Sequence, residues 1–459
     1  MDFPRTLVVL HYHLRPAGVR RVIETALPAI IRAARPHLRR VVVLTGEASP
    51  DGWEERLREA CGLEPEFRVG KSLNYHPRFV SSPVRQQRLA RLIGPDALVW
   101  AHNLSVGRNF GLLADLPAAC EQAGARLLLH HHDWWFDNRW ERVEKRDFAR
   151  LARLTFPRGS NILHATLTRR ECHPLARFLP TLWLPNPVQM APAASRPDGG
   201  WFMPCRVLRR KNILEALLLK SWIAPQSPLR VMGLASSPVE ADYHARIAAL
   251  GQVEFGAGFK PDGPLAVTSL LEGFGLPFLE TAAAGRPFIG RYLANASPDL
   301  RRAGCSLPLL YREIRMSRDW FDFAAETARQ RSLWKQWRSA LPAAARRLAL
   351  PPRFSGKGAS FSRLTLTAQL EVISSRPAWE SAAKGNPVLE KAVESGELPA
   401  ASLTEGARDF FSAETYAQRF WKGVGARRIS PSRDGAFAAM LQQKMAADNL
   451  YPLLMAEIT

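Results

Sequence analysis

The residues whose types and spacing point most directly to chemistry lie in the segment EGFGLPFLE, from Glu272 to Glu280. Its glycines allow the backbone to approach a ligand closely, and Pro277 suits the first position of a helix. The amides before the helix can then face an anion or hydroxyl groups. The two carboxylates would be about 10 Å apart or more, too far for a glycosidase pair but suited to the two ends of one extended ligand. These amides belong to Gly273, Phe274, Gly275 and Leu276.

A basic segment precedes this one in the chain. CRVLRRKNILEALLL, from Cys205 to Leu219, places Arg206 and Lys211 near the start of an expected helix. A basic run of this kind is most often a solvated helix face. Its position after an expected strand and before the glutamate segment favours a site in which cations stabilise the negative charge on a leaving phosphate group.

A third polar segment, HHHDWWFDN, covers His130 to Asn138 at the end of another expected strand. Alternation along the strand places His130 and His132 on one face of it. A metal site is conceivable there, but no further ligand motif supports one, and we predict none. The aromatic residues 134–136 are interpreted either as core or as a platform for an acceptor. A second strand-end loop, HNLSVGRN at 102–109, has polar groups to which the sequence assigns no role.

The elements that must position these residues alternate between strands and helices. Apolar, β-branched runs predict strands at 6–13, 41–45, 97–103, 126–132 and 161–168, with helices at 18–34 and 110–123. After a Pro-rich stretch at 184–200, strands are expected at 201–205, 229–234, 252–255, 265–270 and 287–291, with helices at 212–222, 238–250 and 277–284. Two further helices are expected at 409–421 and 436–450. Each alternation predicts a parallel sheet covered on both faces, with ligands beyond the carboxyl ends of its strands.

Length and charge limit the class of protein. The 459 residues exceed one ordinary core, so two domains are expected. The formal net charge of +21 is interpreted as a solvated basic surface, or as attraction to phosphate-bearing substrates or to an anionic membrane face. Nucleic-acid binding is not expected, because no nucleic-acid-binding motif accompanies the charge.

Cysteine usage and hydropathy suggest a compartment. None of the cysteines is spaced as CxxC, which favours reduced thiols. No signal peptide and no apolar stretch long enough to span a bilayer is recognisable. We therefore expect a cytoplasmic protein that is at most peripheral on the inner face of the membrane.

The segment from Glu272 to Glu280 resembles the E-x7-E signature of group 1 retaining glycosyltransferases of the GT-B fold, the GT4-like family. The resemblance implies that Glu272 contacts the donor sugar at the reacting centre and that Glu280 binds the ribose hydroxyls of a nucleotide sugar. The amides between them would bond to the sugar. The basic segment resembles the start of the family's donor domain, where Arg206 and Lys211 would clamp the diphosphate.

Weaker matches lie elsewhere in the chain. LRPAGVRRVIE at 14–24 resembles the family's Gly-rich loop, in which Gly18 would lie near the donor phosphate. A family histidine that contacts the donor sugar corresponds to His132, with His131 as second candidate. Further similar segments are LPNPV at 184–188, VMGLA at 231–235 and FFSAETYAQRFWK at 410–422, the last resembling a helix that crosses back to the first domain. Two departures are a short connection at 255–269 and Thr268, which stands where a proline is usual.

The expected fold class is α/β, with two facing Rossmann-like doubly wound domains of the GT-B type and a helical C-terminal extension. The expected boundaries are 1–185 for the N-terminal, acceptor-side domain, 200–350 for the donor-side domain and 351–459 for the extension, which includes the helix crossing back.

The activity that the resemblance implies is hexosyl transfer with retention of configuration, from a UDP- or GDP-linked sugar to a glycan, lipid-linked or small-molecule acceptor. Neither a cofactor nor a metal is expected, because the leaving phosphate assists deprotonation of the acceptor in a front-face displacement. Two alternatives stay open, a non-catalytic sugar- or phosphate-binding GT-B scaffold and a same-fold enzyme such as a sugar-nucleotide epimerase. A phosphorylase is less favoured, because no lysine environment suited to pyridoxal phosphate is recognisable.

Overall fold

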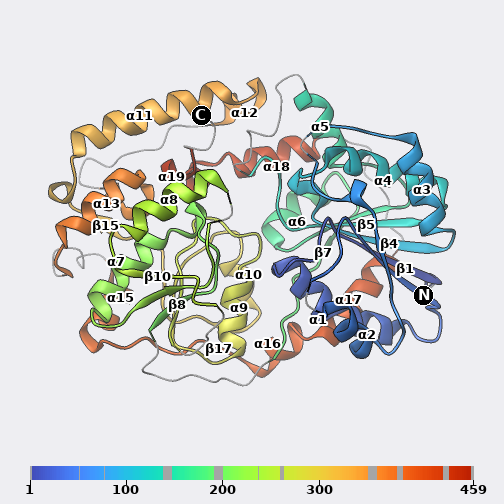
Figure 1. Ribbon diagram of the computed structural model, residues 1–459, viewed down its shortest axis with the longest axis horizontal. Coiled ribbons are helices and arrows are strands. Elements are labelled where there is room, and N and C mark those ends of the chain that lie inside the picture. The colour runs from blue at the N-terminus through green and yellow to red at the C-terminus, as the bar shows by residue number, and fades with distance from the viewer. Residues whose placement is uncertain are drawn as a thin grey trace. The chain divides into compact units, whose positions relative to one another are not determined.

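The computed structural model describes residues 3–50, 52–76, 78–137, 147–190, 200–235, 237–258, 263–349, 359–379, 386–426 and 434–455. The chain divides into two units, each built on a parallel β-sheet covered by helices (Figure 1). The first unit takes its residues from 1–189 and 409–444, and the second from 190–408 and 445–459.

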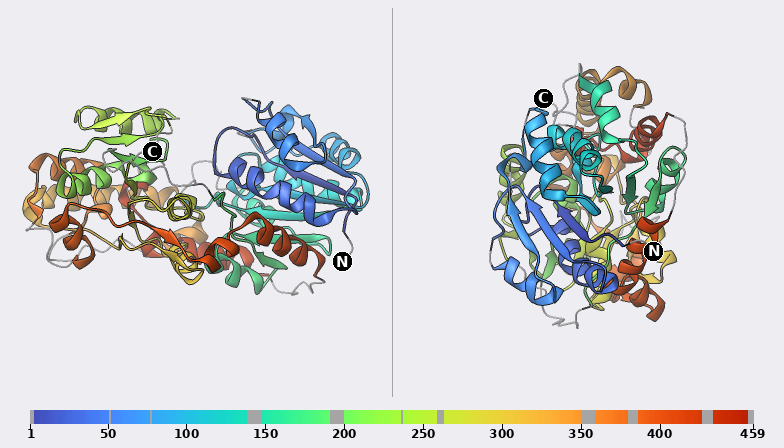
Figure 2. Two further views of the ribbon diagram at one scale, coloured as in Figure 1. Left: turned by 90° about the horizontal axis from the view of Figure 1, so that it is seen from below. Right: turned by 90° about the vertical axis from the view of Figure 1, so that its right-hand side faces the viewer.

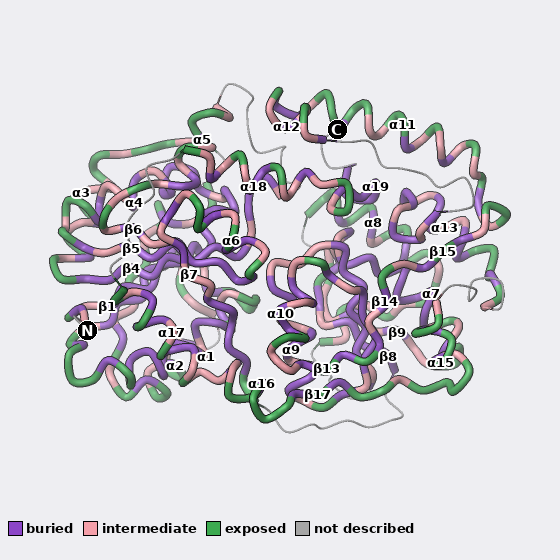
Figure 3. The backbone as a smooth tube through the Cα atoms, turned by 180° about the vertical axis from the view of Figure 1, so that it is seen from behind, coloured by how far each residue is buried: buried purple, intermediate pink, exposed green. Residues whose placement is uncertain are grey.

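The sheet of the first unit has seven strands in the order β3-β2-β1-β4-β5-β6-β7, and all neighbours are parallel. Its central strands are aliphatic and almost entirely buried (Figure 3), as expected where helices cover both faces. The strands are β1 (Thr6–Leu10), β2 (Arg40–Thr45), β3 (Glu66–Val69), β4 (Ala97–His102), β5 (Arg126–His131), β6 (Ile162–Thr166) and β7 (Thr181–Trp183).

The helices of the first unit come from both ends of the chain. They are α1 (Gly18–Ala34), α2 (Trp53–Cys61), α3 (Pro83–Ile93), α4 (Phe110–Gln122), α5 (Phe148–Thr155), α6 (Arg169–Ala176), α17 (Ala413–Gly425) and α18 (Ala436–Lys444). Helix α17 lies beside α1, as the red and blue helices in Figure 2 show. Phe420 packs edge-on against Trp100 of β4 with ring centroids 5.2 Å apart, and the Trp421 indole donates a 2.9 Å hydrogen bond to the Ile30 carbonyl. The C-terminal part of the chain therefore completes the core of the first unit.

The second unit contains a six-stranded parallel sheet in the order β10-β9-β8-β11-β12-β14. Its strands are β8 (Trp201–Met203), β9 (Leu229–Val231), β10 (Val253–Phe255), β11 (Leu265–Val267), β12 (Phe288–Arg291) and β14 (Leu310–Tyr311). Two short antiparallel pairs flank it, β13 (Cys305–Ser306) with β17 (Ser402–Leu403), and β15 (Arg315–Met316) with β16 (Ala359–Ser360).

The helices of the second unit are α7 (Ile213–Ile223), α8 (Pro238–Ala248), α9 (Leu276–Ala283), α10 (Ser297–Arg302), α11 (Phe323–Ala340), α12 (Ala343–Leu348), α13 (Leu366–Ser375), α15 (Pro387–Ser395) and α19 (Pro452–Met455). Helix α16 (Glu405–Phe410) lies where the chain passes back to the first unit. Helix α7 is apolar on nearly all sides, and seven of its eleven residues belong to the core of this unit. No described helix combines the length and the apolar character that crossing a bilayer requires.

Each sheet has one point where the strand order reverses. In the first unit this point lies between β1 and β4, and in the second it lies between β8 and β11. The connections that leave the two strands at such a point run to opposite faces of the sheet and leave a crevice at the carboxyl ends, where ligands bind in doubly wound folds. The segments after β1, β4, β8 and β11 are therefore the places to look for a site.

Several predicted boundaries differ from the structure. The single helix predicted over 409–421 is wrong, because the chain leaves the helical conformation at Ser412, whose side chain accepts a hydrogen bond from the Thr415 amide and starts α17. The predicted extension at 351–459 is shared between the units, since 409–444 lies in the first. Residues 191–199, which form most of the Pro-rich stretch at 184–200, lie outside the described residues.

Candidate functional site

The two motifs of the second unit meet at its switch point. The basic segment leaves β8 through a short 3-10 turn, η5 (Arg209–Lys211), and the glutamate segment follows β11. The buried Thr268 hydroxyl donates to the carbonyls of Lys211 at 2.9 Å and Asn212 at 3.1 Å, and the Leu270 amide donates to the Arg210 carbonyl at 2.7 Å. Thr268 thus binds the two segments together.

Lys211 and Glu272 form the centre of this site. The Lys211 ammonium makes an ion pair with one Glu272 carboxylate oxygen, and Arg210 Nη1 lies 3.0 Å from the other. The Ser269 hydroxyl donates to the same carboxylate at 2.7 Å. Burial alone would raise the pKa of Glu272, but the Lys211 and Arg210 charges outweigh it and lower the pKa to about 2. We call Arg210, Lys211 and Glu272 the ion-pair cluster.

Two of the three charged side chains of this cluster were predicted. Arg206, the other predicted cation, is exposed, and its Cγ lies 3.2 Å from the position that a Cβ on Gly233 would occupy. Arg206 was expected to stand beside Lys211 as the second cation of the site. In the described ion pairs Arg210, which was not predicted, has that position. The sequence signal for Arg210 was its position next to Lys211 in the RRK run. The path of η5 decides which arginine turns toward the carboxylate, and the sequence does not show that path.

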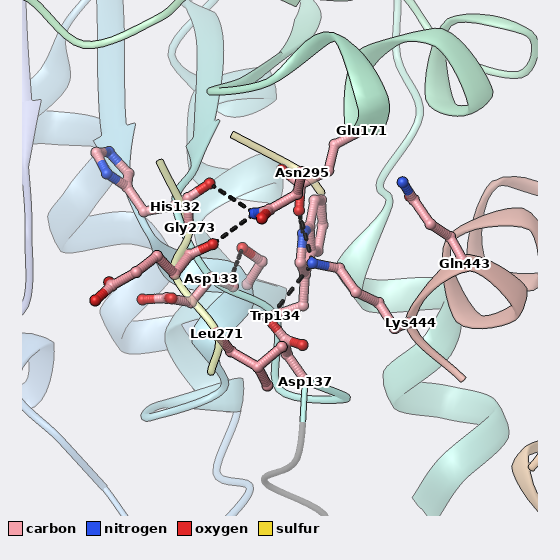
Figure 4. Close-up of polar contacts among 12 residues, drawn as sticks. His132, Asp133, Trp134, Asp137, Glu171, Leu271, Gly273, Asn295, Gln443 and Lys444 are labelled. Atoms are coloured by element: carbon pink, nitrogen blue, oxygen red, sulfur yellow. Dashed lines mark hydrogen bonds and ion pairs between the residues drawn. The ribbon is translucent and has the colours of Figure 1, made fainter. Parts of the chain in front are cut away.

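The glycine loop after Glu272 has the predicted geometry of a helix start. Gly275 is in the left-handed conformation, with φ +80°, and a Cβ there would lie 2.7 Å from the Phe278 ring. Pro277 occupies the first turn of α9. The Asn295 amide donates to the Glu272 carbonyl at 2.5 Å and to that of Gly273 at 3.4 Å (Figure 4). This asparagine, which sequence reasoning missed, holds the loop, while Glu280 is half-buried on α9.

A buried ion pair between Glu215 and Arg291 restrains the segment that bears Lys211. Asn212, with φ +50°, begins α7 and donates a 2.7 Å hydrogen bond to the Glu215 carboxylate. Glu215 in turn makes an ion pair with Arg291 of β12 and accepts a 2.5 Å hydrogen bond from Tyr311 of β14. Both charges are almost fully buried, so breaking the pair would leave an uncompensated charge in the core. The network connects α7 to two strands and restrains the turn that bears Lys211.

The polar groups of the first unit gather at the carboxyl ends of β4 and β5. His102 is the last residue of β4, and its Nδ1 lies 3.1 Å from Nε2 of His132. Asn103, in the left-handed conformation, accepts hydrogen bonds from the amides of His132 at 3.3 Å and Asp133 at 2.8 Å. His132 keeps 7% exposure, and burial lowers its pKa to about 3, so the ring is neutral.

Other predicted residues of the first unit lie as follows. His131 faces away from His132, bonds to His164 at 2.9 Å and stacks on Trp134. Residues 134–136 are buried at 1% exposure or less and pack within the unit, which makes them core rather than an acceptor platform. Gly18 is the exposed first residue of α1, and a Cβ there would meet no atom within 4 Å. The fold itself therefore does not require glycine at this position.

A lysine that sequence reasoning missed secures the segment after β5. Lys444 of α18 lies 2.7 Å from Glu171 and 3.4 Å from Asp137, and the Trp134 indole donates to Glu171 at 3.0 Å (Figure 4). Burial would lower the pKa of Lys444, but the two carboxylates hold it above its ordinary value. Helix α18 is thereby tied to the loop that follows the histidines.

Comparisons with known proteins agree with this architecture. The chain matches no protein-family model. It is 23% identical over 339 residues to the mannosylglucosyl-3-phosphoglycerate synthase of Petrotoga mobilis, an alignment that covers 62% of this chain and 65%, less than two thirds, of that protein. Among solved structures it is similar to Anabaena HepE in complex with UDP and glucose, with a TM-score of 0.52 and 15% identity over 92% of this chain and 100% of the other.

A second structure of HepE, in complex with UDP-glucose, gives a TM-score of 0.50 at 14% identity over 92% of this chain and 99% of the other. At this identity the similarity shows the fold alone. The chain has the GT-B type of α/β fold, as the sequence predicts.

Proposed function

We propose that the protein is a retaining glycosyltransferase that moves a hexosyl group from a nucleotide sugar to an acceptor hydroxyl. The observation that carries this proposal is the ion-pair cluster, which lies at the β8–β11 switch point beside a glycine loop that opens helix α9. Cations, a buried carboxylate and a helix N-terminus at one crevice suit a diphosphate joined to a sugar. The GT-B fold and the relative's name support the same reaction class.

Each group has a proposed part in the reaction. The bond between the sugar's anomeric carbon and the diphosphate breaks, a new bond forms to the acceptor oxygen on the same face, and the acceptor's proton passes to the leaving phosphate. Lys211 and Arg210 stabilise the charge on the diphosphate. Glu272 faces the sugar, where positive character develops.

The remaining predicted residues would bind the donor. Glu280 accepts hydrogen bonds from ribose hydroxyls, and the amides from Gly273 to Leu276 face the sugar. In the first unit, His132 is the candidate for contact with the sugar and Gly18 for approach to the phosphate. Arg206 stays a candidate for the diphosphate, because an exposed side chain at the β8 end can reorient.

The net charge of the chain is the basis for proposing a chemical class of acceptor. The net charge of +21 favours a phosphorylated or otherwise anionic acceptor, whether a small molecule, a glycan or a lipid-linked group at an anionic membrane. The Petrotoga relative is named as a synthase of mannosylglucosyl-3-phosphoglycerate, and phosphoglycerate is a phosphorylated small molecule. A phosphorylated small molecule is therefore the first acceptor to test.

The test is a panel of UDP- and GDP-linked hexoses, with release of nucleoside diphosphate as the readout, together with calorimetric titration of UDP and GDP. We expect binding of one nucleotide and slow release from the matching sugar, faster when an acceptor is added. Binding without release across the panel and with phosphorylated acceptors would favour the non-catalytic scaffold. Absence of binding to either nucleotide contradicts the proposed function.

Transfer should not require a divalent metal, because the cations on the diphosphate are side chains. Turnover in EDTA should equal turnover in Mg²⁺. Loss of activity in EDTA that Mg²⁺ or Mn²⁺ restores would contradict the proposed roles of Lys211 and Arg210.

A further inference from the structure

Three histidines of the first unit come together because of strand register. His102 of β4 and His130 of β5 are direct partners in the parallel ladder, so their side chains stand next to each other on one face of the sheet. His132 follows two residues after His130 and returns to that face. One ring nitrogen from each of the three lies within 4.8 Å of those of the other two. We call these residues the histidine cluster.

The spacing of the cluster is close to that of a metal site. Tetrahedral zinc with nitrogen ligands at 2.0–2.1 Å separates those nitrogens by about 3.3 Å. His102 Nδ1 and His132 Nε2 are already 3.1 Å apart. The third ring needs only to tilt, since its ligand atom lies within 4.8 Å of both.

The protein does not use all of the hydrogen-bonding capacity of these rings. Among the described residues, Nε2 of His102 is buried and has no hydrogen-bond partner, whereas the His130 ring makes a hydrogen bond with the Leu184 backbone. The Trp100 indole donates to His130 Nδ1 over a long 3.4 Å. A histidine ring turned by 180° keeps its outline and places each nitrogen where a ring carbon stood, so the nitrogens that His130 presents to its neighbours depend on which way the ring is turned.

A neighbouring histidine pair shows what a satisfied arrangement looks like. On the opposite face of β5, His131 Nε2 bonds to His164 Nδ1 at 2.9 Å, and His164 Nε2 bonds to the Pro157 carbonyl at 3.0 Å. That chain of hydrogen bonds ends on a backbone acceptor, as buried polar groups usually do. The histidine cluster has the same burial but leaves Nε2 of His102 without a partner among the described residues.

We propose that His102, His130 and His132 form a binding site for one divalent transition-metal ion of the zinc class. Three neutral imidazoles suit Zn²⁺, Co²⁺ or Ni²⁺ and do not suit Mg²⁺ or Ca²⁺, which prefer oxygen ligands. His132, which keeps 7% exposure, provides the side from which an ion enters, and water fills the fourth position. His132 belongs to both this site and the proposed function, but the two are tested separately, because the readout here is metal binding and not transfer.

The experiment uses the full chain after removal of metal with EDTA and dialysis. Titration with Zn²⁺ by calorimetry should show one tight site per chain, and titration with Co²⁺ should give the visible absorption bands of a tetrahedral, nitrogen-ligated ion. Mg²⁺ should not compete. Wild-type protein without a one-to-one site, or with Co²⁺ bands of octahedral type, would overturn the proposal without any variant.

Two variants and a matched control locate the site. His102→Gln and His130→Gln should each weaken Zn²⁺ binding at least a hundredfold. His164→Gln, on the opposite face of the sheet, removes a buried histidine of the same kind and should leave the affinity within about threefold of wild type. Circular dichroism confirms that each variant is folded. Equal loss in all three variants, or undiminished binding in the first two, would assign the ion to another place and overturn the proposal.

Discussion

The two parallel sheets carry different kinds of polar cluster at the carboxyl ends of their strands. At the β8–β11 crevice the side chains are charged, and Glu272 balances Lys211 and Arg210. At the β4–β5 strand ends, next to the β1–β4 crevice, the side chains are neutral imidazoles, whose pKa values burial holds far below the ordinary range. The first cluster is therefore suited to an ionic ligand, whereas the second offers lone pairs and hydrogen bonds. Substitutions that change charge should therefore affect the ion-pair cluster, and a fall in pH should affect the histidine cluster.

The largest effect is expected for Glu272→Gln. This change removes the carboxylate that faces developing positive charge, so kcat should fall about 10²- to 10³-fold, as for the loss of one preorganised electrostatic contact. UDP affinity should be retained, because Lys211 and Arg210 remain. Steady-state kinetics and calorimetry measure the two effects, with Ser269→Ala as a control that keeps the charge. Full kcat in Glu272→Gln would mean that this carboxylate only shapes the turn.

The second effect is on nucleotide binding. Lys211→Ala should weaken the affinity for the nucleoside diphosphate by about 1.5–3 kcal/mol, or roughly 10- to 150-fold, because it removes a charge-assisted contact. Lys391→Ala on the exposed face of α15 changes the net charge equally and should leave the affinity unchanged. Calorimetry distinguishes the two variants. Equal weakening in both would show that only the overall charge matters.

The third prediction compares the response of the two units to acid. Burial lowers the folded-state pKa of His132 to about 3 and that of His11 to about 4, while the unfolded values are near 6.5. The unfolded chain therefore binds more protons, and stability is lost as the pH falls from about 6.5 toward the folded values, by about 1.4 kcal/mol per pH unit for each histidine. The contribution of Glu272 to stability changes over a lower range of pH. Its folded-state pKa of about 2 is below the ordinary value of 4.5, so its contribution is lost only below about pH 4.5.

Hydrogen–deuterium exchange at pH 7.5 and 5.5, corrected for intrinsic rates, tests this difference. Peptides from β4 and β5 should lose protection, whereas those from β8 and β11 should keep it. Equal losses in both units would contradict the contrast between neutral and charged clusters.

The smallest effect is expected for Glu280→Gln. The variant keeps its shape and one acceptor oxygen, so the KM for the donor should rise only about two- to tenfold, with kcat unchanged. Kinetics with the same donor as for Glu272→Gln give the comparison. If both variants show the same binding-only defect, the two glutamates do not have separate roles.

Regular patterns in the sequence predicted much of the fold. Helix α1 begins and ends where predicted, at Gly18 and Ala34, because its apolar residues recur with helical period. Strand β3 was missed because this edge strand, EFRV, has no buried residue, and β7 because this edge strand has only one. Short edge strands obtain their conformation from a neighbouring strand rather than from their own composition.

The site was predictable where its residues follow one another along the chain. The glutamate segment and Lys211 were identified from local spacing, and the structure brings Lys211 and Glu272 together. His102 was not connected to His132, and Asn295 was not considered. Both contacts depend on the register of strands or the placement of loops that are distant in sequence. The signal available for the histidines was that two consecutive predicted strands, 97–103 and 126–132, both have histidine at or next to their carboxyl ends.

Helix α17 has a consequence for how the protein is made. Translation produces residues 190–408, most of the second unit, before Phe420 and Trp421, yet these two residues complete the core around Trp100 and α1. While the ribosome synthesises residues 190–408, the emerging N-terminal sheet lacks this cover, and its apolar face is open to chaperones or to misassembly. A premature stop codon before residue 409 would damage the half of the protein that had been synthesised first.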